Sequence, residues 1–180
     1  SFDYKASYNP ETVNPRQTRG GPRMISKPGY ALSASLDTDG KKKLFYSVNA
    51  YTHRRPSTDS YDWNVNPSVE WKPISTLTLS VGPGYERLRE DAQYLMKQRD
   101  PTATATYGTR NLFGTLDQTT VSANLRINVA FTPNLSLQMF AQPLVSAGHY
   151  TGIKELARGR SYDFNVYGTG ASTFDPATGM

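Results

Sequence analysis

The chain has 180 residues, 37% of them hydrophobic, and carries a formal net charge of +5. A mean hydropathy of −0.59, without a long apolar run, excludes a transmembrane helix, which needs about 18 consecutive apolar residues. The basic residues are scattered and form no stripe with interleaved aromatics, which argues against a nucleic-acid partner. Cysteine is absent, which excludes a disulfide framework and thiolate chemistry.

A two-residue alternation of apolar and polar side chains runs along the chain, as in β-strands with one apolar face. In the clearest stretch, Val121, Leu125 and Val129 lie on the side opposite to Ser122 and Arg126. No stretch shows a helical pattern. The alternation predicts about eight strands, at 2–8, 30–36, 44–50, 63–71, 77–85, 121–131, 135–145 and 162–166.

The predicted connections alternate in length. Short turns are expected at 37–41, 72–75 and 132–134, and long polar connections at 9–28, 52–61, 87–111 and 146–161. Transmembrane barrels combine short periplasmic turns with long external loops. The sequence therefore predicts an all-β fold, an antiparallel up-and-down transmembrane β-barrel in the bacterial outer membrane, with membrane lipid as its partner.

Each face of the predicted wall has its own residue types. Trp63 and Trp71 lie eight residues apart on one apolar face, about 26 Å along a strand, which fits one ring near each membrane interface. The predicted interface aromatics are Tyr30, Tyr46, Trp63, Trp71, Tyr85 and Phe131. The predicted lumen-facing residues are Ser47, Asn49, Asn64, Asn66, Glu70, Asn124, Arg126 and Asn128.

Three prolines disagree with this pattern, because proline removes a donor from the hydrogen-bond ladder of a sheet. We expect Pro83 and Pro143 near the outer rim, at bulges or strand ends. Pro67 has no explanation in the sequence.

Several segments resemble, in order, a bacterial outer-membrane barrel family filed as domain of unknown function 5916. They are residues 18–22, 37–42, 100–108, 116–120, 154–158 and 161–168. Family members carry an N-terminal domain similar to family 9 carbohydrate-binding modules, followed by the barrel. The resemblance implies that residues 1–180 are one internal segment of a larger barrel, ending in a loop at 171–180. The family offers no catalytic motif to transfer.

Few residues suggest chemistry. Residues 37–40, Asp-Thr-Asp-Gly, resemble the start of a calcium loop, but three lysines follow where further oxygen ligands are needed, so a hairpin turn is expected. His53 with Asp59 or Asp62 could form an acid–base pair. No cofactor or metal is predicted. A glycan site is one option for the loop residues Tyr94, Tyr107, Tyr150, Arg87, Arg89, Arg99 and Arg110.

The leading functional hypothesis is a non-catalytic outer-membrane barrel for passage, docking or surface capture of a nutrient, with a glycan or a partner outer-membrane protein as candidate ligands. A second hypothesis is a soluble extracellular β-sandwich that binds glycans or proteins, which requires Trp63 and Trp71 to be buried. A third is a hydrolase at the barrel rim, which requires His53 within hydrogen-bond reach of a carboxylate.

Overall fold

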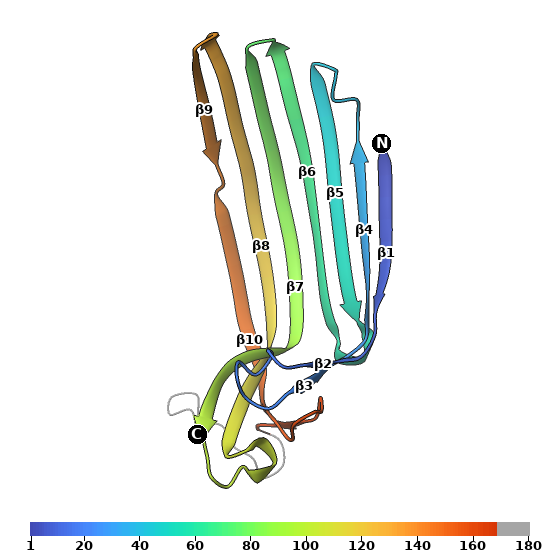
Figure 1. The fold of residues 1–180 in the computed structure, drawn as a ribbon, viewed down its shortest axis with the longest axis vertical. Coiled ribbons are helices and arrows are strands. Elements are labelled where there is room, and N and C mark those ends of the chain that lie inside the picture. The colour runs from blue at the N-terminus through green and yellow to red at the C-terminus, as the bar shows by residue number, and fades with distance from the viewer. Residues whose placement is uncertain (169–180) are drawn as a thin grey trace.

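The computed structural model describes residues 1–168, which form an antiparallel all-β fold (Figure 1). The expected loop at 171–180 lies outside the described residues. Two short 3₁₀ turns, Pro56–Thr58 and Thr104–Thr106, are the only helical elements described. The strands are β1 (Phe2–Asn9), β2 (Thr12–Asn14), β3 (Met24–Ser26), β4 (Gly29–Asp37), β5 (Leu44–Arg55), β6 (Ser60–Ile74), β7 (Leu77–Arg99), β8 (Thr109–Thr132), β9 (Leu135–Ala141), β10 (Leu144–Leu156) and β11 (Phe164–Val166).

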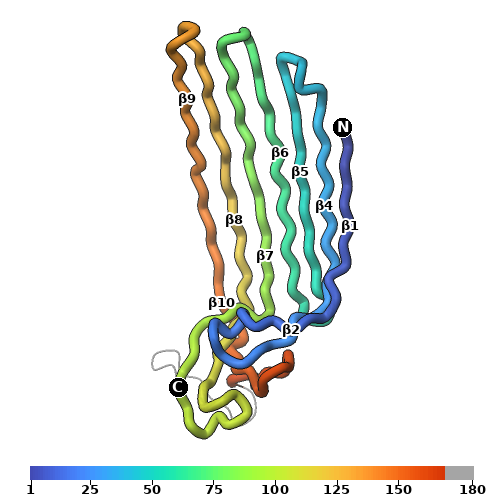
Figure 2. Tube along the Cα trace, viewed as in Figure 1, coloured from blue at the N-terminus to red at the C-terminus, as the bar shows by residue number. Residues whose placement is uncertain are grey.

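One large sheet, which we call the wall, dominates the structure. Its strands follow the order β1-β4-β5-β6-β7-β8-β10-β11, and β9 pairs with β8 beyond the end of β10. Neighbours in space are thus neighbours in sequence, apart from β2 and β3, which form a separate two-stranded sheet. This confirms the all-β antiparallel prediction. A closed barrel is not found, because within residues 1–168 the sheet is open, with β1 at one edge (Figure 2).

The strand register sorts the side chains of the wall into two faces. Tyr46 pairs with Val69, and Val69 with Val81, so the apolar residues of neighbouring strands share one side. We call this the apolar face, and the opposite side the polar face. The apolar face includes Tyr4, Leu32, Leu36, Tyr46, Val48, Trp63, Val65, Val69, Trp71, Leu79, Val81, Tyr85, Val121, Leu125, Ile127, Val129, Leu137 and Met139.

No second layer of described residues covers the apolar face. Trp63 is 39% exposed and Trp71 is 49% exposed. Leu125 and Ile127 on β8 are also exposed. The burial of both tryptophans that a soluble β-sandwich requires is therefore absent from residues 1–168.

Three of the four predicted long connections are wrong, because strands continue through them. β7 extends to Arg99 and β10 to Leu156, and only residues 56–59 separate β5 from β6. The fourth, 9–28, contains β2 and β3. Beyond the apolar stretch both faces of these strands are polar, as at Glu86 and Arg87. The backbone hydrogen-bond ladder continues there, but the apolar-polar alternation that indicates a strand in a sequence is absent.

The long strands lead into a compact end region, which we call the cap: residues 10–28, 90–115 and 152–168. Figure 1 shows it at the end of the wall opposite the three short turns. Its core contains Met24, Phe113 and Leu156, all at most 2% exposed. Phe164 packs edge-on against Phe113, with ring centroids 5.4 Å apart. The cap is thus the one part of the described chain with an ordinary hydrophobic core.

Pro83 and Pro143 lie within the wall and not near its rim, so the expected rim position is wrong, whereas the expected strand end is confirmed for Pro143. Pro83 pairs with Ala123, whose N–H donates to the carbonyl of Pro143 over 3.0 Å. Pairing between β6 and β7 lapses around the position where Pro67 faces Pro83, and shifts again between Trp71 and Ile74 near the turn. Neither proline has an N–H to donate to the ladder, and the two residues lie opposite each other at this one gap. At Pro143 the outer strand breaks into β9 and β10.

Candidate functional site

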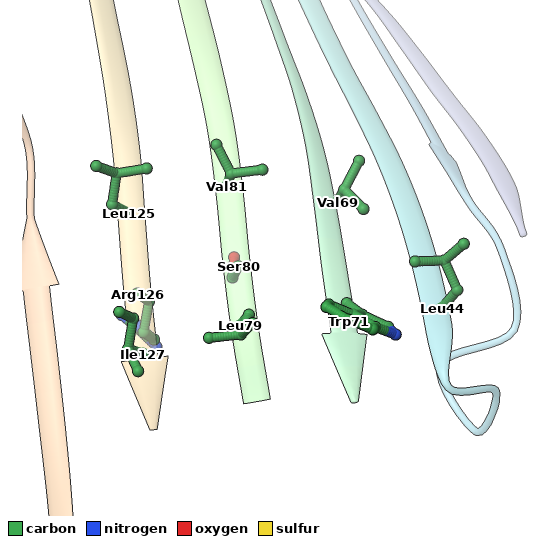
Figure 3. A pocket seen from close by; sticks show the side chains of 9 residues that line it. All are labelled: Leu44, Val69, Trp71, Leu79, Ser80, Val81, Leu125, Arg126 and Ile127. Carbon is green, nitrogen blue, oxygen red and sulfur yellow. The ribbon is translucent and has the colours of Figure 1, made fainter. Parts of the chain in front are cut away.

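A shallow apolar hollow lies on the apolar face near the short turns, formed by the neighbouring strands β5, β6, β7 and β8 (Figure 3). Leu125, Val81 and Val69 form one row across β8, β7 and β6. The next row includes Trp71 and Leu44. A continuous exposed apolar surface of this kind is suited to contact with an apolar environment or an apolar partner.

The apolar face ends in aromatic pairs, and charged residues follow. The rings of Tyr8 and Tyr30 lie 5.2 Å apart, as do those of Trp63 and Tyr85. Arg87, the next residue of β7 on this face, pairs across the ladder with Trp63. Aromatic rings therefore separate the apolar surface from a charged one.

This aromatic edge runs obliquely across the wall. Across the hydrogen-bond ladders Tyr30 is aligned with Tyr61, which lies two residues before Trp63 on β6. Trp63 is in turn aligned with Arg87, which lies two residues after Tyr85 on β7. The edge thus moves by four residues, about 13 Å, over three strand spacings of about 4.8 Å. Strands tilted by about 40° to the edge produce this shift, which is the tilt of strands in transmembrane barrels.

All eight predicted lumen residues lie on the polar face. The register pairs Asn49 with Asn66 and Asn124 with Gly82, and Ser47 shares a 2.7 Å hydrogen bond with Ser68. The remaining members, Asn64, Glu70, Arg126 and Asn128, share this side through the same ladders. A face of small polar side chains suits contact with water or a hydrophilic solute.

Local contacts organise the side chains of the polar face. Asn66 donates to the Asn64 side chain over 3.0 Å, and Lys72 lies 2.8 Å from Glu70. The Arg126 guanidinium lies 5.6 Å from the ring centre of Phe140.

The predicted acid–base pair is adjacent but does not form a hydrogen bond in the described residues. His53 and Asp62 face each other across β5 and β6. Burial, followed by the charge of Arg55, lowers the pKa of His53, whereas burial raises the pKa of Asp62. Because no contact orients the imidazole toward the carboxylate, the hydrolase hypothesis gains no support from this geometry.

The loop residues considered for a glycan site do not gather at one place. The ring of Tyr94 packs edge-on against Phe113 in the cap. Arg87 and Arg89 both bind Asp117, at 3.3 and 3.0 Å. Tyr107 lies in a cap loop and is 81% exposed. Tyr150 lies on β10, and Arg99 ends β7.

Arg110 joins β8 to its neighbours through carboxylates. Its Nε lies 2.6 Å from Asp100, and its Nη1 lies 2.9 Å from Glu155, which also accepts from Tyr167. Hydrogen bonds from Thr102 and Arg110 lower the pKa of Asp100 to about 2. These contacts fix the cap loop against β8 and β10.

A second charged cluster lies beside the cap core. Lys154 donates to Asp91 over 2.8 Å, and Tyr162 donates to the same carboxylate over 3.1 Å. The Lys154 ammonium also lies 4.8 Å from the ring centre of Phe164. Sequence patterns do not reveal this cluster, because Asp91 and Tyr162 are 71 residues apart.

Neither a metal centre nor a membrane-crossing helix is seen in the described residues. No group of three or more metal-ligating side chains gathers in residues 1–168. At the Asp-Thr-Asp-Gly turn, Asp39 accepts the Lys41 N–H over 3.0 Å, as expected for a solvated hairpin. None of the described residues forms a helix long and apolar enough to span a bilayer.

Comparison with known proteins gives no further guide to function: no family model, no curated protein and no solved structure matches the chain.

Proposed function

We propose that this chain forms the wall of a bacterial outer-membrane β-barrel, with the apolar face toward lipid and the polar face toward a water-filled route for a nutrient. The observation that carries the proposal is the uncovered apolar face, bounded by the aromatic pairs Tyr8–Tyr30 and Trp63–Tyr85 and then by charge. In a membrane this face would contact acyl chains, and the rings would lie near the headgroups.

The dimensions of β6 agree with this orientation. Trp63 and Trp71 are separated by eight residues, about 26 Å along the strand. A tilt of about 40° reduces the separation across the bilayer to about 20 Å, slightly less than the apolar band of about 25 Å that is typical of such barrels.

The unpaired edges of the sheet require further strands if the wall is to lie in a membrane. In hydrocarbon, each unpaired backbone N–H or C=O costs several kcal/mol. The outer edges of β1 and β9 lack partner strands among residues 1–168. The proposal therefore requires further strands to close the barrel, in agreement with the resemblance to a larger barrel family.

Cysteine scanning tests the orientation, because residues 1–180 contain no cysteine. Single cysteines at Asn66, Asn124 and Asn128 are compared with cysteines at Val69, Leu125 and Ile127, in the full chain reconstituted into lipid vesicles. We expect a lipid-dissolved reagent to label only the second set, and a water-soluble maleimide to label the first set far faster. Failure of the lipid-dissolved reagent to label the apolar set would refute the membrane orientation.

Vesicle swelling tests passage. We expect small neutral sugars to enter vesicles that contain the full chain, and Asn66→Trp or Asn124→Trp to slow their entry. The control Leu125→Trp, on the apolar face, should leave the rate unchanged. If labelling succeeds but no sugar enters, the barrel docks or anchors a ligand and is not a passage.

A further inference from the structure

The cap contains a hollow of about 500 Å³, remote from the apolar face and formed by three separate chain segments. Its lining consists of residues 20–23, Thr106, Tyr107, Thr109, Gly159 and Arg160. This volume lies within the range of small-molecule binding pockets. The hollow is independent of the wall residues discussed above.

Main-chain contacts hold the three segments together. The N–H of Arg160 donates to the carbonyl of Arg23 over 2.7 Å, and the N–H of Gly159 donates to the carbonyl of Ala105 over 3.4 Å. A Cβ atom at Gly159 would lie 3.3 Å from Pro22 and 3.8 Å from the Tyr107 ring. The hollow is thus framed by backbone, and its lining side chains are not needed to hold it open.

The lining carries uncompensated positive charge. Arg23 and Arg160 are exposed, and neither guanidinium contacts a carboxylate in the described part of the chain. Asp163 and Asp100, the acidic residues in the adjacent loops, already bind Arg158 and Arg110. Two free guanidinium groups at one hollow favour an oxyanion, since each can donate two parallel hydrogen bonds to a carboxylate or phosphate.

The backbone at the hollow is unusual. Tyr107 and Arg160 have φ values of 58° and 55°, in the left-handed region that residues with a Cβ atom rarely adopt. Such residues concentrate at ligand sites. The Tyr107 ring, 81% exposed, offers a flat apolar surface beside the two arginines.

We propose that this hollow binds a small soluble molecule carrying a carboxylate or phosphate group. Arg23 and Arg160 hold the oxyanion, and Tyr107 covers the ring or apolar side of the rest of the ligand. A lipid headgroup does not fit, because β7 carries the chain away from the aromatic edge at Tyr85 into the far end of the cap (Figure 1). The inference holds whether or not the wall spans a membrane.

Titration calorimetry on the purified full chain in detergent tests the proposal, with phosphate, glucuronate, glucose 6-phosphate and glucose as probes. We expect binding of at least one anion and none of glucose. Arg23→Ala and Arg160→Asn should each weaken anion binding at least tenfold. Tyr107→Asn should weaken the sugar anions and leave phosphate unchanged. Asparagine is chosen at Tyr107 and Arg160 because it tolerates the left-handed conformation.

Arg16→Ala is the matched control, an exposed arginine of the cap outside the hollow. It should bind as the natural chain does. Equal loss in Arg16→Ala and Arg23→Ala, equal binding of glucose and glucuronate, or no binding of any anion would each overturn the proposal. Near-ultraviolet circular dichroism verifies that every variant keeps a folded cap, and cysteine labelling of the wall reports the membrane function separately.

Discussion

The indole ring of Trp63 and the phenol ring of Tyr85 lie on adjacent strands with their centroids 5.2 Å apart, and Arg87 is the next residue of β7 on the same face. An apolar surface, an aromatic pair and a guanidinium thus succeed one another along the wall. This order matches the layers of a membrane, in which apolar residues face acyl chains, aromatic residues lie near headgroups and charged residues lie in water. One of the two expected membrane interfaces thus lies at Trp63 and Tyr85, which can be tested by single substitutions.

The two tryptophans, the only ones in the chain, make the depth of the wall measurable. In lipid vesicles, Trp63→Phe and Trp71→Phe each leave one fluorophore. We expect lipids brominated near the headgroup to quench either tryptophan more strongly than lipids brominated at the chain end, because both rings should lie near interfaces. Stronger quenching of either by chain-end bromine would contradict the assigned band.

A charge placed on the apolar face should destabilise the inserted barrel. Leu125→Arg lies near the middle of this face and should destabilise the inserted barrel by about 2–4 kcal/mol, the cost of arginine at the bilayer midplane. Asn124→Arg, one residue away on the polar face, should cost far less. Urea unfolding in vesicles measures both, and a larger loss for Asn124→Arg would invert the assignment of the faces.

The ion pair of Lys154 and Asp91 should stabilise the cap strongly. The Lys154 side chain is only 9% exposed, so Lys154→Met leaves the Asp91 carboxylate partly buried without its cation. We expect a loss of about 3 kcal/mol, at the low end for a broken buried pair. The control Lys27→Met breaks an exposed pair with Glu11 and should cost less than about 1 kcal/mol. Chemical denaturation followed by near-ultraviolet circular dichroism compares them.

Asp100 should confer a pH dependence on the cap. Its folded pKa of about 2 lies below the ordinary value of 3.8, so the ionised carboxylate stabilises the cap above pH 4. That stabilisation should fade as the pH falls toward 2. Carbon-13 titration of the Asp100 carboxyl should show the low midpoint, and Arg110→Gln should shift it upward. An unchanged midpoint in Arg110→Gln would exclude this arginine as a cause.

The strands of the apolar band were predictable because one buried or lipid-facing side imposes a period of two on the sequence. Residues 63–71 and 121–131 carry that period and lie within β6 and β8. Residues 87–99 do not, because polar residues occupy both faces of β7 just beyond the aromatic edge, and register shifts at Glu90/Gln93 and Tyr94/Met96 interrupt the alternation within the cap. Pro67 was unexplained because its partner Pro83 is known only from the register.

The sequence by itself determined the all-β class, the alternation of the faces and the position of the short turns, since these depend on residues close together in the chain. Only the tertiary structure decided that β7 and β10 continue into a cap, that Asp91 meets Lys154 and Tyr162, and that Arg23 and Arg160 share one hollow. The physical reason is sequence separation. Contacts between residues tens of positions apart follow from strand register and chain path, which local hydropathy does not encode.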